Sequence, residues 1–260
     1  MTTTTPHSTA GYANVNGLRM YYEIHGAGGT PLVVLHGGLL TIDVTFGAML
    51  PELAANRQVI AVELQGHGHT ADIERDITLD NLAGDVVALL DDLGIELADL
   101  FGFSLGGLTA VRVASLHPDR VGRLVAAATH FRSDGYHPGI RDGAPDTAGR
   151  LPTAEEFQQW QDAYNRVAPD PDYFFTLAAK ATPAPDDVDG WSEADLRAIT
   201  ASTLLIIGDN DFVRLDHAAA MRDLIPGAQL AVIPGSTHMG LLSRTDILLP
   251  MVESFLSEKG

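Results

Sequence analysis

The sequence predicts an α/β protein with a doubly wound, mostly parallel β-sheet and an inserted, mainly helical cap. The sheet is predicted because short apolar runs alternate with longer stretches in which apolar residues recur at helical spacing. Alternating strands and helices imply right-handed crossovers, which place the strands parallel in one sheet. The cap is predicted because this alternation breaks between about residues 130 and 200, where proline and aromatic residues concentrate.

The composition limits the class of protein. The chain has 260 residues, 45% of them hydrophobic, which suits one large domain or a core with a modest insertion. A formal net charge of −18 disfavours nucleic acid and anionic membranes as partners, since both are bound through basic surfaces. The absence of cysteine excludes disulfides and thiolate catalysis. No signal peptide or apolar run of ~20 residues is evident, so we expect a cytoplasmic protein.

The first half of the chain is predicted to form a hairpin followed by alternating elements. Tyr12-Ala13-Asn14-Val15 and a strand over 18–24 flank Asn16-Gly17, a strong two-residue turn signal. Continuous apolar runs predict strands covered on both faces. The expected strands are 31–35, 58–64, 98–101 and 123–129, and the expected helices are 44–55, 79–93 after the N-cap Thr78, and 108–116.

Residues 130–200 are interpreted as a cap over the strand ends, because linkers are poor in large aromatic residues. Helical patches are expected at 154–167 and 171–181. Alternation resumes with strands at 202–207 and 229–233 and helices at 216–225 and 246–256. The predicted division is a first core segment at 1–129, the cap at 130–200 and a second core segment at 201–260.

A candidate nucleophile stands in the segment Gly102-Phe103-Ser104-Leu105-Gly106-Gly107. It lies between a predicted strand and a predicted helix, the context that gives a G-x-S-x-G sequence chemical meaning. The sharp turn requires glycine at Gly102 and Gly106 and exposes the Ser104 hydroxyl. A serine hydroxyl is a weak nucleophile alone, so a base and an orienting acid must come from elsewhere.

Four histidines follow predicted strands and are candidates for the base: His36, His67, His130 and His238. His238 follows the last strand on a loop rich in Gly and Ser, and it comes after an acid in the order Ser…Asp…His. We therefore predict His238 as the base. His36 and His67 are expected to hold their own loops, and His130 to open the cap and line the pocket.

Three aspartates after the preceding strand compete for the role of the acid. Asp209 is expected to make the turn, and Asp216 to cap or open the next helix. Asp211 lies further into the loop, where its side chain can bend towards the histidine loop. We predict that Asp211 accepts the imidazole N–H and fixes the tautomer of His238.

The remaining site predictions concern the oxyanion hole and the pocket. The backbone N–H of Leu105 is one expected oxyanion donor, and Gly38 or Leu39 supplies the second. Leu39, His130, Trp160 and Met239 are the expected pocket residues. No metal or other cofactor is expected, since Ser, His and Asp suffice for the chemistry.

Six motifs together resemble the α/β-hydrolase fold superfamily, in particular its small esterase, lactonase and cofactor-free haloperoxidase-like members. The resemblance implies Ser104 as nucleophile, Asp211 as acid, His238 as base, and Gly38 and Leu105 as oxyanion donors. One departure is Glu63-Leu64-Gln65, where relatives usually have Asp-x-x or Asp-x-Arg. The motifs are Leu35-His36-Gly37-Gly38, Gly66-His67-Gly68-His69-Thr70, Gly102-Phe103-Ser104-Leu105-Gly106-Gly107, His117-Pro118-Asp119-Arg120-Val121, Gly208-Asp209-Asn210-Asp211 and Pro234-Gly235-Ser236-Thr237-His238.

The sequence therefore predicts a serine hydrolase that cleaves a carboxylic ester or lactone of a small apolar molecule through an acyl-enzyme. The same triad can serve C–C bond hydrolysis or perhydrolysis with haloperoxidase-like activity, and the sequence does not separate these reactions. A ligand-sensing protein on a hydrolase scaffold is a third alternative, because fold alone does not fix function. The oligomeric state is not predicted.

Overall fold

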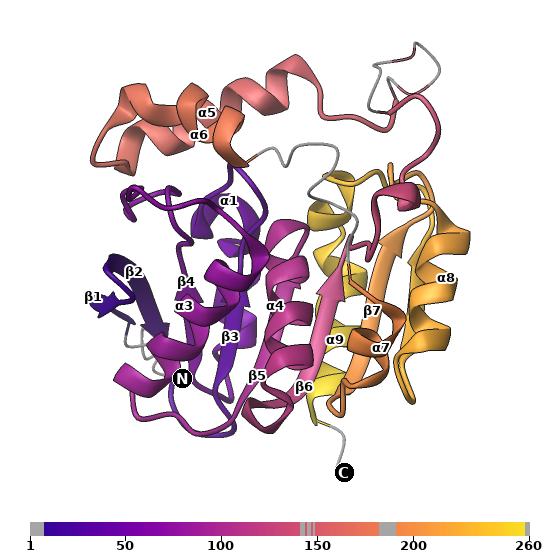
Figure 1. Cartoon of the computed structure of the whole chain (residues 1–260), viewed down its shortest axis with the longest axis horizontal. Coiled ribbons are helices and arrows are strands. Elements are labelled where there is room, and N and C mark those ends of the chain that lie inside the picture. The colour runs from indigo at the N-terminus through magenta and orange to yellow at the C-terminus, as the bar shows by residue number, and fades with distance from the viewer. Residues whose placement is uncertain (1–7, 141–143, 145–146, 148, 182–190, 258–260) are drawn as a thin grey trace, which may run out of the picture.

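A mixed β-sheet forms the middle layer of the molecule (Figure 1). The computed structural model describes residues 8–140, 144, 147, 149–181 and 191–257, and within them the sheet has eight strands in the order β1-β2-β4-β3-β5-β6-β7-β8. The strands are β1 (Ser8–Val15), β2 (Leu18–His25), β3 (Leu32–Leu35), β4 (Val59–Val62), β5 (Ala98–Phe103), β6 (Val121–Ala127), β7 (Ser202–Gly208) and β8 (Gln229–Ile233). β1 and β2 run antiparallel to their neighbours, and β3 to β8 pair in parallel. The predicted doubly wound, mostly parallel sheet is confirmed.

Asn16 and Gly17 form the predicted turn of the first hairpin. Their φ angles are 49° and 82°, as a two-residue turn that matches the twist of its strands requires. Val15 pairs with Leu18 directly across this turn. β1 includes Ser8 and so extends beyond what the hydrophobic pattern indicates, because its first residues pair with the end of β2, Ser8 with His25.

Helices cover both faces of the sheet. They are α1 (Ile42–Phe46), α2 (Leu50–Leu53), α3 (Leu79–Asp92), α4 (Leu105–Leu116), α5 (Ala154–Val167), α6 (Phe174–Ala181), α7 (Glu193–Arg197), α8 (Leu215–Leu224) and α9 (Thr245–Ser257). Alternate residues of β3 enter opposite cores: Val33 and Leu35 pack with α3 and α4, and Leu32 and Val34 pack with α1, α2 and α9. Burial on both faces explains the continuous apolar runs.

The prediction of one helix over 44–55 is wrong, because two short helices occupy this segment. Thr41 begins α1 by accepting a hydrogen bond from the N–H of Val44. α1 ends at Gly47, and Pro51 lies in the first turn of α2. Proline has no N–H to donate to the carbonyl four residues earlier, so it suits the first turn of a new helix, where that N–H would have no partner.

α5 and α6 lie across the carboxyl-terminal edge of the parallel strands (Figure 1). Both occupy segments where helical patches are predicted, and Thr153 and Glu156 start α5 with reciprocal hydrogen bonds. α7 was not predicted; it contacts α4 and α8, and its Leu196 belongs to the core. Within the predicted cap, residues 141–143, 145–146, 148 and 182–190 lie outside the described residues, and its boundaries stay a prediction.

Asp72 ties α6 to the core below it. Its carboxylate accepts hydrogen bonds from the Nζ of Lys180 at 2.6 Å and from the hydroxyl of Tyr173, both on the cap side. From the core side, the Nε2 of Gln65 donates to the same carboxylate at 2.7 Å. The cap is thus held down by a charged contact at its second helix. Over the described part of the chain, no helix combines the length and hydropathy that crossing a bilayer demands.

Candidate active site

Ser104 occupies the sharp turn between β5 and α4. Its φ of 52° and ψ of −118° are unusual for a residue with a side chain, a conformation that occurs where tertiary structure enforces it. A Cβ atom on Gly102 would lie 2.2 Å from the carbonyl oxygen of Gly106, and one on Gly106 would lie 2.0 Å from that of Leu35. Neither position has room for a side chain, as the sequence predicts.

His238 lies between Ser104 and Asp211. Its Nε2 is 3.0 Å from the Ser104 hydroxyl oxygen, and its Nδ1 is 2.9 and 3.1 Å from the two carboxylate oxygens of Asp211. His238 is 4% exposed and Asp211 is fully buried. An ionised carboxylate only accepts hydrogen bonds, so Nδ1 carries the proton and Nε2 offers its lone pair to the hydroxyl. The structure thus brings the three predicted side chains together in the predicted order.

The two competing aspartates have other partners. Asp209 accepts a hydrogen bond from the backbone N–H of Ser236 at 3.1 Å, and backbone donors at Gly235 and Ser236 lower its pKa. Asp216, in the first turn of α8, accepts from the Nε of Arg214, which lowers the pKa of this carboxyl. Asp209 therefore holds the loop that carries His238, and Asp211 contacts the ring itself.

His36 and His67 form a buried pair apart from this arrangement. The Nε2 of His36 accepts from the N–H of Leu64 at 3.0 Å, so its Nδ1 donates to the carbonyl of Gly37 at 2.7 Å. Burial lowers the pKa of His36 to about 3 and that of His67 to about 4. Both are neutral and hold their loops, as predicted. Among the residues that the structure describes, no group of three or more His, Asp or Glu side chains is arranged to bind a metal ion.

The proposed oxyanion donors are close neighbours. A Cβ atom on Gly38 would lie 3.8 Å from the Cβ of Leu105, so the loop after β3 approaches the first residue of α4. The N–H groups of a first helical turn have no partner within their own helix and favour negative charge. Leu39 has a φ of 63°, which turns the loop beside Gly38. These positions suit donors to the oxyanion of a substrate carbonyl that Ser104 has attacked.

A cavity of about 920 Å³ opens over Ser104 and His238. All four predicted pocket residues line it: Leu39, His130, Trp160 and Met239. Trp160 comes from α5, and Ala178 and Lys180 come from α6, so the cap and the core both contribute to the lining. The cavity belongs to the same edge of the sheet on which the three side chains meet.

Phe212 and Tyr136 are pocket residues that the sequence analysis missed. Phe212 stacks on the His238 ring, with centroids 4.0 Å apart and planes at 25°. Tyr136 packs edge-on against Phe212, and its hydroxyl lies 3.2 Å from the Nε2 of His130. Phe212 directly follows Asp211, so its place after the predicted acid was the available signal. Together these rings fix one side of His238.

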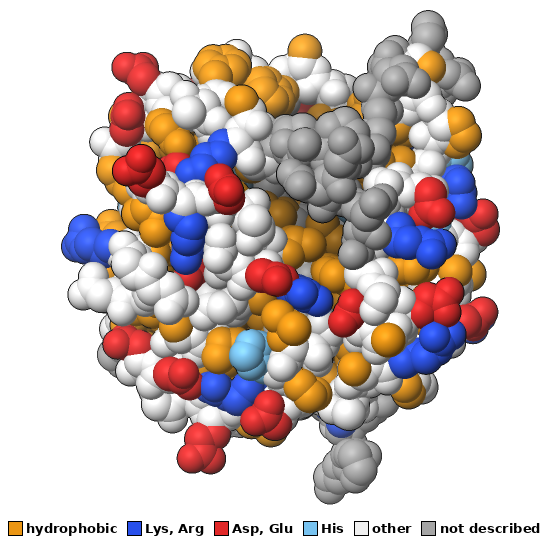
Figure 2. Space-filling view, viewed as in Figure 1, with side chains coloured by type: hydrophobic (Ala, Val, Ile, Leu, Met, Phe, Trp, Pro, Cys, Tyr) orange, Lys and Arg blue, Asp and Glu red, His pale blue; other side chains and the backbone are white. Residues whose placement is uncertain are grey.

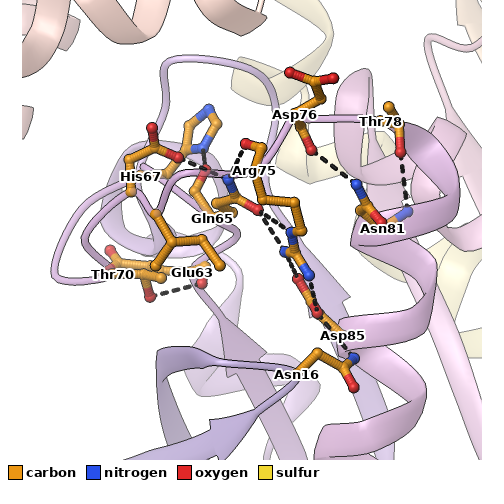
Figure 3. A network of polar contacts seen from close by, with 12 residues as sticks. Asn16, Glu63, Gln65, His67, Thr70, Arg75, Asp76, Thr78, Asn81 and Asp85 are labelled. Carbon is orange, nitrogen blue, oxygen red and sulfur yellow. Dashed lines mark hydrogen bonds and ion pairs between the residues drawn. The ribbon is translucent and has the colours of Figure 1, made fainter.

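Glu63 and Gln65, which depart from the usual family pattern, take part in a polar network (Figure 3). Glu63 is buried, and its carboxylate accepts a hydrogen bond from the backbone N–H of His69 at 2.5 Å. The same carboxylate oxygen lies 2.8 Å from the Nδ1 of His69, and this contact raises the pKa of His69. Gln65 accepts from the Nε of Arg75 at 2.9 Å, and Arg75 forms an ion pair with Asp85 of α3. The departure thus supports the loop after β4, and these contacts do not involve Ser104, Asp211 or His238.

Comparison with known proteins identifies the family. A model described as "alpha/beta hydrolase fold" matches residues 30–164. A 2-hydroxymuconate semialdehyde hydrolase of Pseudomonas sp. (strain CF600) is 32% identical to this chain, covering 91% of this chain and 90% of the relative.

Two solved structures share the architecture. The enol-lactonase from Burkholderia xenovorans LB400 has a TM-score of 0.72 at 22% identity, covering 95% of this chain and 100% of its own. The 2-hydroxy-6-oxo-6-phenylhexa-2,4-dienoate hydrolase of Rhodococcus sp. strain RHA1 has a TM-score of 0.79 at 19% identity, covering 98% of this chain and 100% of its own. At these identities the likeness concerns the fold. The family model matches residues 30–164, and a relative that is 32% identical covers 91% of the chain. The chain therefore belongs to the α/β hydrolase fold family.

Proposed function

We propose that this protein is a serine hydrolase that cleaves a carboxylic ester or lactone of a small apolar molecule through an acyl-enzyme. The observation that carries the proposal is the 3.0 Å contact between the His238 Nε2 and the Ser104 hydroxyl at the floor of a cavity. A hydroxyl hydrogen-bonded to a neutral imidazole, which an ionised carboxylate orients, is an activated nucleophile.

The proposed reaction has two halves, and in each half His238 acts first as a base and then as an acid. Ser104 attacks the carbonyl carbon as its proton passes to His238, and Asp211 stabilises the imidazolium. The N–H groups of Leu105 and Gly38 bind the oxyanion. His238 then protonates the departing alcohol oxygen. A water molecule, deprotonated by His238, attacks the acyl carbon; the bond to the Ser104 oxygen breaks, His238 returns the proton to that oxygen, and the acid is released.

The charges around the cavity favour a neutral substrate. Among the described lining residues, the permanent cations are Arg112 and Lys180. Both are already paired with carboxylates: the Nε of Arg112 lies 2.5 Å from Asp80, and the Nζ of Lys180 lies 2.6 Å from Asp72. An anionic substrate would have to compete with these carboxylates, whereas a neutral ester or lactone would not.

The direct test is the Ser104→Ala variant with p-nitrophenyl acetate. We expect kcat to fall by about 10⁴-fold or more, because the nucleophile acts as a unit with its base. Mass spectrometry should locate a fluorophosphonate label on Ser104 in the native protein. Undiminished ester turnover by the variant would refute the proposal.

C–C bond hydrolysis is the second candidate, and the relatives favour it. The 32% identical relative is named as a 2-hydroxymuconate semialdehyde hydrolase. The paired state of Arg112 and Lys180 weighs against an anionic substrate of that kind. Comparing kcat/KM for 2-hydroxymuconate semialdehyde and for p-nitrophenyl esters decides between the two. A higher value for the semialdehyde would establish the second candidate.

A further inference from the structure

The cavity extends from Ser104 along one face of α4. Leu105, Leu108 and Arg112 all line it and stand on the same side of the helix, three and four residues apart. All three are half-buried, whereas the opposite face of α4 is buried in the core. At 1.5 Å per residue, the helix from Ser104 to Arg112 measures about 12 Å.

The walls of this extension are apolar until its end. Leu79 and Leu82 of α3 and Trp191, which precedes α7, line the cavity with the two leucines of α4. Figure 2 shows hydrophobic side chains near the centre of the side of the molecule on which α3, α4 and α7 lie. We name the set Leu79, Leu82, Leu105, Leu108, Trp191 and Arg112 the α4 groove.

Arg112 marks the polar end of the α4 groove. Its Nε donates to the carboxylate of Asp80 at 2.5 Å, and its Nη1 lies 4.0 Å from a carboxylate oxygen of Asp195. The guanidinium is therefore held by α3 and α7, and its charge is balanced by two acids. An apolar chain gains nothing by passing this point, since it would then displace charged groups from water or from one another.

The position of His238 decides which part of an ester enters the groove. His238 and Asp211 follow β8 and β7, whereas the wall with Leu79 belongs to α3, after β4 on the other side of β5. His238 must protonate the leaving alcohol, so the alcohol departs on the β7–β8 side. The acyl group, which stays bonded to Ser104, then extends towards α3 and α4.

We infer that the α4 groove binds the acyl chain of the substrate, a neutral unbranched chain or apolar ring system that ends near Arg112. This inference rests on the proposed ester hydrolysis. A groove of about 12 Å holds an extended chain of about nine or ten carbon atoms, given C–C bonds of about 1.5 Å in a zigzag. The specificity residues are Leu108, midway along the groove, and Arg112 at its end.

The first test fills the groove with Leu108→Trp and measures kcat/KM for p-nitrophenyl esters from acetate to dodecanoate. We expect the decanoate-to-acetate ratio to fall about tenfold or more, because each lost apolar contact reduces discrimination in a hydrophobic pocket. The matched control is Leu116→Trp, the same exchange at the exposed end of α4, where Leu116 is 44% exposed and outside the cavity lining. The control should keep the native ratio.

The second test removes the polar end with Arg112→Met, which keeps most of the apolar stem. We expect the preferred acyl chain to lengthen beyond about ten carbons, while Arg112→Lys restores the native limit. Thermal unfolding of each variant separates a changed preference from a damaged fold, since Arg112 also joins α3 and α7.

A third series, alkyl acetates of increasing alcohol length, tests the acyl assignment. Leu108→Trp should leave the length dependence of this series as in the native protein. A change in the alcohol series instead of the acyl series would overturn the inference, as would an unchanged acyl ratio in an active Leu108→Trp enzyme. Failure of the proposed function is distinguished from both, since it would appear as ester turnover that survives Ser104→Ala.

Discussion

The carboxylate of Asp211 determines which ring nitrogen of His238 carries the proton. An Asn at this position would keep the shape but present an amide that can donate to Nδ1 of His238. The proton would then sit on Nε2, where it blocks acceptance of the Ser104 proton. We expect Asp211→Asn to lower kcat for p-nitrophenyl acetate by about 10⁴-fold, with a smaller change in KM.

Asp216→Asn is the matched control for that variant. It is the same exchange, five residues later, on a carboxylate that contacts Arg214 and not His238. We expect kcat within about twofold of the native value, since exposed ion pairs contribute little. Equal losses in the two variants would show that Asp211 is not the orienting acid.

At the residue level, a site residue could be predicted where the backbone requires a particular local sequence at the same place as a reactive side chain. Ser104 can be predicted because the turn requires glycines beside it. His238 and Asp211 can be predicted from their order in the chain and their positions after strands. Phe212 had only its place directly after Asp211 as a signal, and Tyr136 had none, because any aromatic side chain in the cap has the same local pattern. Which ring packs on His238 depends on tertiary contacts.

At the level of elements, strands and long helices followed from periodicity, whereas short elements did not. The apolar spacing at 44–55 is satisfied equally by one helix or by α1 and α2, and Pro51, which suits a first helical turn, favours a second helix that begins there. α7 has only five residues, too few for a periodic signal. Its position depends on Leu196 reaching the core beside α4.

The contact of Asp72 with α6 gives an element-scale prediction. Burial raises the pKa of Asp72, but hydrogen bonds from Lys180, Tyr173 and Gln65 outweigh this and lower it, so the ionised form holds the cap. Asp72→Asn removes the charge from these contacts and should destabilise the cap by about 1–3 kcal/mol. We expect faster hydrogen exchange for the amides of α6 than in the native protein, and unchanged exchange in α4.

Asp172→Asn is the control for the cap, because its side chain is exposed and lies one residue from Tyr173. Its exchange rates should match the native protein in α6 as in α4. If α6 exchanges at the native rate in Asp72→Asn, the cap is held by its apolar contacts, among them Phe174 and Leu177, and not by the charged contact.

At the scale of the whole molecule, two buried neutral histidines couple stability to pH. His36 and His67 have pKa values of about 3 and about 4 in the fold, against an ordinary 6.5, mainly because burial disfavours the charged ring. Below pH 6.5 the unfolded chain binds protons that the folded chain excludes. The stability contributed by this pair is therefore fully present above pH 6.5 and is lost as the pH falls towards 4.

Each of these histidines should contribute a slope of about 1.4 kcal/mol per pH unit to the free energy of unfolding between about pH 6 and pH 4.5. The contact of His69 with Glu63 raises the pKa of His69, so this residue contributes a slope of the opposite sign. His69 is present in both proteins when the His67→Gln variant is compared with the native chain, so its contribution cancels. Urea unfolding at several pH values should give a smaller slope for His67→Gln than for the native chain by about that amount, whatever its stability at pH 7. His117→Gln, outside the buried pair, should keep the native slope. If His67→Gln keeps it too, His67 is protonated in the fold, and the loop after β4 is held by a charged ring instead of a neutral one.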